Sequence, residues 1–199
     1  MIDIFYKMIV HKDSGYIEVI IGSMFSGKTS TLVNIYEKAL YCNIKPLVIN
    51  HSFDTRYSES QMSTHDKKMI PCTFTKKLYD INNNDEKNEV LMNSKVILIN
   101  EGQFFNDLYD WVKDMCDNYN KQIYVCGLDG DFRRKKFGQI LDLIPICDKV
   151  EKIHAFCSNC KDGTKGIFSN RLTNEKSQCS IGVDNYESLC RKCYLEKNN

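Results

Sequence analysis

The sequence predicts an α/β fold: a mostly parallel β-sheet flanked by helices, followed by a small cysteine-rich unit. Three observations predict it. Short apolar runs typical of buried strands alternate with longer stretches whose apolar residues recur on one helix face. Polar motifs follow directly after three of these runs, at the edge where parallel sheets bind ligands. Two C-x-x-C pairs lie near the end of the chain.

Composition is that of an ordinary globular protein, with 199 residues, 42% of them hydrophobic and 27% charged. This length holds one full domain and a small appendage. We expect an N-terminal extension at residues 1–14, an α/β domain at 15–150 and the cysteine-rich unit at 151–199. The formal net charge of +1 gives no reason to expect nucleic acid or membrane as a partner.

The N-terminus does not resemble a secretory signal, because Asp3 and Lys7 interrupt its apolar stretch. No segment has the apolar length of a membrane span, so we expect a cytoplasmic protein. In such a compartment ten cysteines argue against a disulfide framework. Outside the two pairs, six scattered cysteines are expected to be small buried side chains: Cys42, Cys72, Cys116, Cys126, Cys147 and Cys179.

The first apolar run, Tyr16 to Ile21, leads into a glycine loop and then a helical stripe. The loop GSMFSGKT fits G-x-x-x-x-G-K-[ST] at every fixed position, which predicts a P-loop NTPase-like domain. Its backbone N–H groups and the helix N-terminus would hold a polyphosphate. Lys28 would reach the β- and γ-phosphates, and the Thr29 hydroxyl would ligate Mg²⁺. The alternative is an ordinary Gly-rich turn. The residues assigned to ATP here are Gly22, Ser23, Met24, Phe25, Ser26, Gly27, Lys28 and Thr29.

The next segments are a buried strand and a long polar stretch. Residues 46–50 (PLVIN) predict the strand, and the stretch from 51 to 68 carries DTRY and STHD. A loop this long is either functional or simply solvated, and both readings stay open. Residues 70–74 predict a short strand, and the polar residues 82–88 a surface turn leading into a short helix.

A third strand, Lys95 to Asn100, is followed by Glu101 and Gly102. P-loop proteins place an acidic residue at the end of such a strand, and Glu101 is the only carboxylate in this motif. Adjacent strand residues point to opposite faces, so Asn100 and Glu101 cannot do the same job unless the chain turns between them, and Gly102 favours such a turn. Glu101 would take a proton from an attacking hydroxyl. The alternative is a Glu that caps the next helix, predicted within residues 104–119.

Residues 122–127 predict another strand, after which LDGDFRRKKFG places four consecutive cations between Phe132 and Phe137. A solvated basic turn is the common alternative, and a nucleic-acid patch is weakly supported because acidic residues are close by. At the mouth of a P-loop sheet, one cation would stabilise the transferring phosphate while the aromatic rings flank a flat ligand.

The two C-x-x-C pairs are Cys157 with Cys160 and Cys190 with Cys193. Four thiolates suit one tetrahedral structural Zn²⁺, and they leave no position open for catalysis. The alternative is a set of unrelated thiols or two redox pairs. The polar, glycine-containing segment between the pairs lacks the apolar content for a core of its own, so zinc would join its two ends.

Five motifs in the order GSMFSGKT, DTRY, STHD, EGQFF and LDGDFRRKKFG resemble the type II thymidine kinases, the cellular and poxvirus-type enzymes. The resemblance runs from about Gly15 to Tyr194. It implies transfer of phosphate from ATP with Mg²⁺ to thymidine, a structural Zn²⁺, and a zinc-anchored lasso that closes over the nucleoside. It also implies a homotetramer, with thymidine triphosphate (dTTP) as a feedback inhibitor.

The resemblance assigns roles residue by residue. The catalytic residues it implies are Glu101, as general base for the thymidine 5′-hydroxyl, with Lys28 and Arg134. On the nucleotide side it adds Asp54, Thr55, Arg56, Asn100 and Gln103. On the thymidine side it gives Phe104, Leu128, Phe132, Phe137, the lasso residues Ser177, Gln178, Cys179, Ser180, Ile181 and Gly182, and Tyr186.

The sequence departs from the family pattern at several positions. Asn100 replaces the usual Asp, so this residue brings no negative charge to Mg²⁺. Asp131 replaces Thr and Lys136 replaces Pro in the basic loop. Gly182 stands between Ile181 and Val183, where the family often has two adjacent glycines, so a stiffer lasso is expected.

A second function class remains: a zinc-containing P-loop ATPase that binds nucleic acid. From Glu151 onward there are eight Lys or Arg residues against six Asp or Glu. That surplus is too small for a surface that follows a phosphate backbone. ATP turnover that requires DNA or RNA would favour this alternative.

Overall fold

The computed structural model describes residues 14–53, 61–63, 69–175, 177–178 and 185–198. The N-terminal extension therefore lies almost wholly outside the described residues, and so do Asp54, Thr55, Arg56, Cys179, Ser180, Ile181 and Gly182. In the described part of the chain, no helix combines the length and apolar character needed to cross a membrane.

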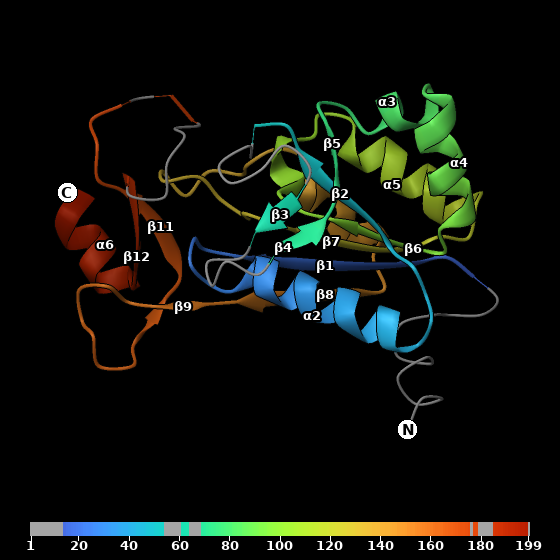
Figure 1. Cartoon of the computed structure of the whole chain (residues 1–199). Helices are drawn as coiled ribbons and strands as arrows, with labels where there is room; N and C mark the ends of the chain where they lie inside the picture. Colours follow the sequence, from blue (N-terminus) through green and yellow to red (C-terminus); the bar gives the residue numbers. More distant parts are fainter. Residues whose placement is uncertain (1–13, 54–60, 64–68, 176, 179–184, 199) are drawn as a thin grey trace.

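A six-stranded sheet in the order β5-β2-β6-β7-β1-β8 forms the centre of the molecule (Figure 1). Every pairing between its neighbouring strands is parallel, which confirms the predicted fold class. The strands are β1 (Tyr16–Gly22), β2 (Leu47–His51), β5 (Thr73–Thr75), β6 (Val96–Ile99), β7 (Gln122–Gly127) and β8 (Lys149–Ile153).

Helices cover both faces of this sheet, because residues along each central strand alternate between two apolar clusters. On one face Ile20, Leu98 and Tyr124 pack against α2 (Lys28–Tyr41). On the other face lie α3 (Tyr79–Asn82), α4 (Asp85–Asn93), α5 (Leu108–Asp117) and the 3₁₀ turn η2 (Ile140–Ile146). Figure 1 shows α2 alone on its side and α3, α4 and α5 opposite it.

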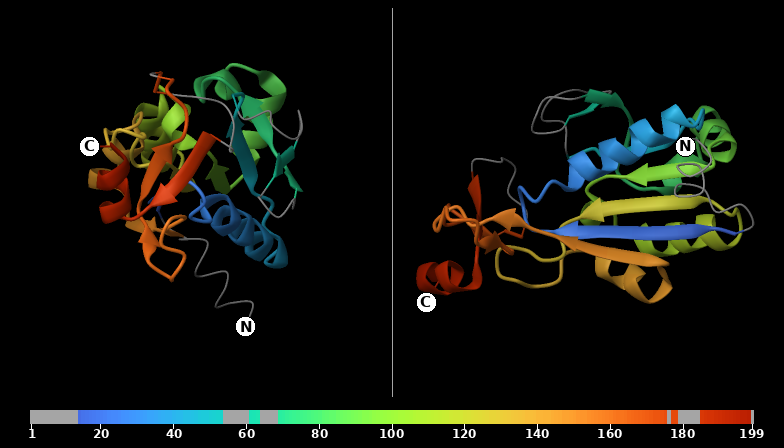
Figure 2. Two further views of the ribbon diagram at one scale, coloured as in Figure 1. Left: turned by 90° about the vertical axis from the view of Figure 1, so that its left-hand side faces the viewer. Right: turned by 90° about the horizontal axis from the view of Figure 1, so that it is seen from below.

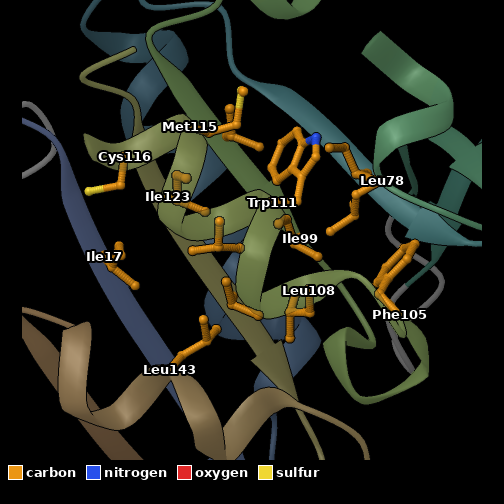
Figure 3. Close-up of a cluster of buried hydrophobic side chains, with 14 of the residues drawn as sticks. Ile17, Leu78, Ile99, Phe105, Leu108, Trp111, Met115, Cys116, Ile123 and Leu143 are labelled. Atoms are coloured by element: carbon orange, nitrogen blue, oxygen red, sulfur yellow. The ribbon is translucent and has the colours of Figure 1, made fainter. Parts of the chain in front are cut away.

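The larger apolar cluster includes Trp111, which lies beside Leu78 (Figure 3). Its ring is fully buried, and its Nε1 donates to Asn82 Oδ1 at 2.7 Å, so the one polar atom of the ring is satisfied. Leu108, Met115 and Trp111 line the inner side of α5, as the sequence pattern predicted. This packing fixes the sheet whose carboxyl edge carries the site.

The C-terminal unit consists of two small hairpins and a helix beyond the carboxyl ends of the strands (Figure 2). β9 (Ala155–Phe156) pairs with β10 (Lys165–Gly166), β11 (Phe168–Arg171) with β12 (Tyr186–Leu189), and α6 (Arg191–Asn198) follows. A further short pair, β3 (Gln61–Ser63) with β4 (Met69–Pro71), lies beside the sheet. The unit has a core of its own, formed by the cysteines with Leu189, Tyr194 and Phe168.

Three details differ from the expectations. The strand expected at 70–74 divides into β4 and β5 on either side of Cys72. The helix expected from Phe104 begins at Leu108, after the short 3₁₀ turn η1 (Gly102–Phe104). The expected domain boundary between 150 and 151 falls inside β8, which pairs with β1 as far as Ile153. The division into domains stays a proposal, and this pairing favours a boundary after Ile153.

Candidate active site

The phosphate loop joins β1 to α2. Two of its residues have positive φ, Phe25 at 62° and Gly27 at 88°, which gives the loop its tight turn. Gly22 has no room for a side chain, because a Cβ there would lie 2.2 Å from the carbonyl oxygen of Ile153 on β8. Among the described residues, no side chain caps α2 and no acidic residue lies in its first turn. The helix N-terminus therefore keeps its positive end directed at the loop.

Lys28 is buried at the start of α2, and its Nζ donates to the carbonyl oxygen of Ser23 at 2.7 Å. The lysine therefore lies across the loop, and its predicted contact with the β- and γ-phosphates stays a prediction. Burial lowers the pKa of Lys28, and the negative charge of Glu101 opposes this effect. The ammonium and the Glu101 carboxylate thus act on each other within one site.

Glu101 follows β6 directly and has a left-handed backbone, with φ 53° and ψ 43°. The turn that Gly102 was expected to favour is therefore present, at Glu101 itself. Its Oε2 accepts a hydrogen bond of 2.6 Å from Gln103 Nε2, and Gln103 Oε1 accepts one of 3.0 Å from the Leu128 N–H. Gln103 is 2% exposed. It links the carboxylate to the loop after β7, a role that the sequence reading did not give it.

Asn100 lies on the other side of this turn, in a buried polar network. Its Nδ2 donates to Asn50 Oδ1 at 3.1 Å. Its Oδ1 accepts from Cys126 Sγ at 3.0 Å and lies 3.4 Å from the Thr29 hydroxyl. Burial raises the pKa of Cys126 to about 12, so the thiol keeps its proton and can donate. Asn100 therefore turns its oxygen toward Thr29, the residue expected to ligate Mg²⁺.

Aromatic rings line the next part of the site. Phe104 and Phe137 meet edge to face, with ring centroids 5.5 Å apart. The His51 ring, at the end of β2, lies 5.6 Å from Phe104 and 4.8 Å from Phe105. The structure thus brings together two of the three phenylalanines expected to form the thymidine pocket.

The basic loop is held closed by Asp131, which is 5% exposed. Its Oδ1 accepts from the N–H groups of Arg133 and Lys135, each at 2.9 Å. Its Oδ2 accepts from the side chain of Gln178, an expected lasso residue, at 3.1 Å. The carboxylate in place of the family's Thr therefore offers two acceptor oxygens, one that shapes the loop and one that binds the lasso residue Gln178.

Arg134 has φ 62° within this loop. Its guanidinium carbon lies 4.7 Å from the ring centroid of Tyr194 and 5.4 Å from that of Phe168. Both rings belong to the C-terminal unit, so cation–π contacts hold this side chain there. The catalytic role expected for Arg134 stays a prediction.

Comparison with known proteins shows which family has this phosphate loop and these motifs. A profile of the thymidine kinase family matches residues 15–194. The thymidine kinase of Sheeppox virus (strain KS-1) is 41% identical over 92% of this chain and 98% of its own length. That of Variola virus (isolate Human/India/Ind3/1967) is 39% identical over 92% and 99%. The cytosolic thymidine kinase of Homo sapiens is 38% identical over 94% and 76%.

The chain belongs to the thymidine kinase family. Both the profile and the identity over most of the chain confirm the resemblance seen in the motifs. All five motifs of that resemblance lie within the matched residues 15–194.

A member of the thymidine kinase family is expected to hold Zn²⁺ in its C-terminal unit, and the cysteines fit such an ion. The Sγ atoms of Cys157, Cys160, Cys190 and Cys193 all lie within 4.8 Å of one another. The Cys160 Sγ is 3.8 Å from that of Cys190 and 3.5 Å from that of Cys193. Four thiolates about 2.3 Å from a zinc ion would be about 3.8 Å apart. The cluster can hold zinc.

Arg171 is the functional candidate that sequence reasoning missed. It is 7% exposed, and its guanidinium donates to the carbonyl oxygens of Glu175, Ser177 and Gln178. It also donates to the Tyr186 hydroxyl, and its charge lies 4.0 Å above the Phe132 ring centroid. One cation thus joins the described lasso residues to two expected thymidine-pocket rings. No feature of the sequence distinguishes Arg171 from the other arginines, because it belongs to no motif and the strand β11 that carries it is too short to show a period.

Proposed function

We propose that the chain transfers the γ-phosphate of ATP to the 5′-hydroxyl of thymidine, giving thymidine monophosphate and ADP. One observation carries the proposal: Glu101 stands at the carboxyl edge of the sheet, directly after Asn100, whose Oδ1 lies 3.4 Å from the phosphate-loop hydroxyl of Thr29. A loop that holds a polyphosphate and a carboxylate beside it are the two parts that phosphoryl transfer to an alcohol requires. Family membership supports thymidine as that alcohol.

In the proposed reaction the phosphate loop holds the triphosphate through backbone N–H groups. The thymidine 5′-oxygen attacks the γ-phosphorus, and the bond to the β,γ-bridging oxygen breaks, leaving ADP. Glu101 accepts the hydroxyl proton, and Gln103 holds the carboxylate in position. Lys28 and Arg134 offset negative charge on the transferring group. Thymidine lies between Phe104, Phe132 and Phe137 under the lasso.

Two ions complete the proposal. Thr29 and Asn100, with two oxygens 3.4 Å apart, fit Mg²⁺, which prefers oxygen ligands. When bound, Mg²⁺ neutralises phosphate charge. The four cysteines would hold Zn²⁺, which joins the hairpins of the C-terminal unit. We also propose a cytoplasmic homotetramer inhibited by dTTP, and elemental analysis, sedimentation and inhibition assays test these extensions.

The test incubates purified protein with ATP, Mg²⁺ and a panel of nucleosides, and measures the monophosphate by chromatography. Thymidine should give product, and Glu101→Gln should keep ATP affinity while its transfer rate falls by about 10²–10⁴-fold. Glu89→Gln, a change at an exposed position on α4, serves as the control. Undiminished transfer by Glu101→Gln would exclude Glu101 as the base. ATP turnover that requires DNA or RNA would replace the whole proposal.

A further inference from the structure

The phosphate loop is bonded directly to the C-terminal unit through the peptide groups of Met24. The Met24 N–H donates to Ser169 Oγ at 2.9 Å, and the Met24 carbonyl accepts from Ser188 Oγ. Ser169 on β11 and Ser188 on β12 stand directly opposite each other in the hairpin. One cross-strand pair of hydroxyls thus satisfies both backbone polar groups of a single loop residue. We call these two residues the serine pair.

The contact is buried and continues into the loop. Ser169 and Ser188 are 5% and 1% exposed. Ser23, which precedes Met24, donates its hydroxyl to the carbonyl oxygen of Gly166 at 2.8 Å. The Ser23 carbonyl accepts from Ser26 Oγ and from Lys28 Nζ, each at 2.7 Å. A displacement of the hairpin would therefore move the loop residues that position Lys28.

The position of the hairpin in turn depends on the cysteine cluster. Ser188 is followed by Leu189 and Cys190, both buried in the small core of the C-terminal unit. The Ser188 carbonyl accepts from the Ser158 N–H at 2.9 Å, next to Cys157. The serine pair therefore lies between the cysteines on one side and the phosphate loop on the other.

We propose that the serine pair positions the phosphate loop, so that affinity for the nucleotide depends on the C-terminal unit as well as on the loop sequence. A loop that is already ordered loses less conformational entropy when a polyphosphate binds, so it binds more tightly. Ser169 and Ser188 are positioning residues in this scheme, since neither supplies a group to the phosphate. The inference rests on the proposed function, because it assumes that the loop binds a nucleotide.

The test measures the affinity of a fluorescent ADP analogue for the full-length protein and for Ser169→Ala, Ser188→Ala and the double variant. Each loss of a buried hydrogen bond should weaken binding about 3- to 10-fold, and the double variant should be weaker still. Hydrogen exchange should be faster at the Met24 amide in Ser169→Ala. Ser94→Ala is the matched control, because it removes another buried hydroxyl, bonded to the Val90 carbonyl at the end of α4.

The outcomes separate the two proposals. Weaker nucleotide binding in the serine-pair variants, with Ser94→Ala equal to wild type, supports the positioning role. By linkage, bound nucleotide should then also slow hydrogen exchange in β11 and β12 of the wild type. Unchanged affinity in folded Ser169→Ala and Ser188→Ala would overturn the inference and leave the kinase proposal standing. A wild-type protein that binds no nucleotide would overturn the proposed function itself.

Discussion

Glu101 has a backbone conformation that few residues other than glycine adopt. Its left-handed φ of 53° costs roughly 1–2 kcal/mol relative to a relaxed backbone. Gly102, which follows it, serves another purpose: a Cβ there would lie 2.7 Å from Val125 Cγ1 on the neighbouring strand β7. The turn therefore combines strain at one residue with close packing at the next, and Gln103 Nε2 holds the carboxylate at 2.6 Å. Strain of this kind is typical of a preorganised site, which agrees with the role proposed for Glu101.

The substitution Asn100→Asp should destabilise the fold and strengthen Mg²⁺ binding. The change removes the donor to Asn50 Oδ1 and buries a carboxylate beside it, so the free energy of unfolding should fall by about 1–3 kcal/mol. The added charge near Thr29 should lower the Mg²⁺ concentration needed for half-maximal activity. Thermal unfolding and a Mg²⁺ titration measure the two effects.

The control for this variant is Asn118→Asp, because Asn118 Nδ2 makes a comparable bond to Asp114 at an exposed site. It should change neither quantity appreciably. Identical unfolding temperatures and identical Mg²⁺ curves for wild type and Asn100→Asp would remove Asn100 from the metal environment.

His51 predicts a pH dependence of stability. Burial lowers the pKa of His51 from about 6.5, against weaker opposing effects of the Lys76 carbonyl and the Asp107 carboxylate, while the Lys76 ammonium lowers it further. Its Nδ1 accepts from the Phe53 N–H at 3.1 Å, so the folded protein holds the neutral ring. The unfolded chain therefore binds the proton first as the pH falls.

The stability that the neutral His51 ring contributes is thus present above pH 6.5 and is lost as the pH falls toward the folded-state pKa. The unfolding temperature should be lower at pH 5.5 than at pH 7.5, and His51→Gln should reduce that difference. A difference of equal size in both proteins would assign the pH dependence to other groups.

Among the structural elements, the C-terminal unit depends most on its cysteines. Its strands have two to four residues each, and its core consists of five buried residues with Cys160 and Phe168 packed against them. Such a core is too small to offset the entropy of ordering the two hairpins. The four sulfurs and the ion they would hold must supply the rest of the stabilising free energy.

Cys160→Ser should therefore lower the zinc content and unfold the hairpins while the main sheet stays folded. Elemental analysis and hydrogen exchange of residues 155–171 measure this, with exchange in β6 and β7 as the internal reference. Cys147→Ser, at a partly exposed cysteine outside the cluster, is the control. Unchanged protection of the hairpins in Cys160→Ser would show that the unit folds without a complete ligand set.

The sequence predicted the helices and strands accurately where the pattern is contained within the segment itself. β7 agrees with its apolar run residue for residue, and β6 differs by one residue at each end. A strand was predicted at 150–156, where the chain forms β8 and β9, but β10, β11 and β12 were not predicted, because two to four residues carry no readable period and their pairing depends on the distant cysteines. The role of Arg171 could not be seen either, since its partners at Glu175, Ser177 and Gln178 are main-chain carbonyls.

At the scale of the whole molecule, the sheet order sets which segments must come together. β1 lies between β7 and β8, and β8 is an edge strand with four of its five residues exposed. A chain that ends at residue 148 lacks this strand, whereas one that ends at residue 156 keeps it. Both chains lack the complete hairpins and α6, so the comparison isolates β8. Because the shorter chain leaves the edge of β1 unpaired, it should be less soluble, and denaturant titration should show it to be less stable. Equal midpoints would show that β8 adds nothing to the sheet.

The central place of β1 also has a consequence for biosynthesis. Glu18 pairs with Lys149 across a sequence separation of 131 residues. At about 5–20 residues per second, roughly 7–26 seconds pass between the synthesis of these two strands on the ribosome. Residues 17–21 have no partner strand until β7 (Gln122–Gly127) is made late in that interval, and their other edge stays open until β8 is made. Added ATP cannot shorten this wait, because β7 and β8 flank the strand that leads into the phosphate loop. The nascent chain should therefore be a client of chaperones that bind exposed apolar segments until β7 and then β8 emerge.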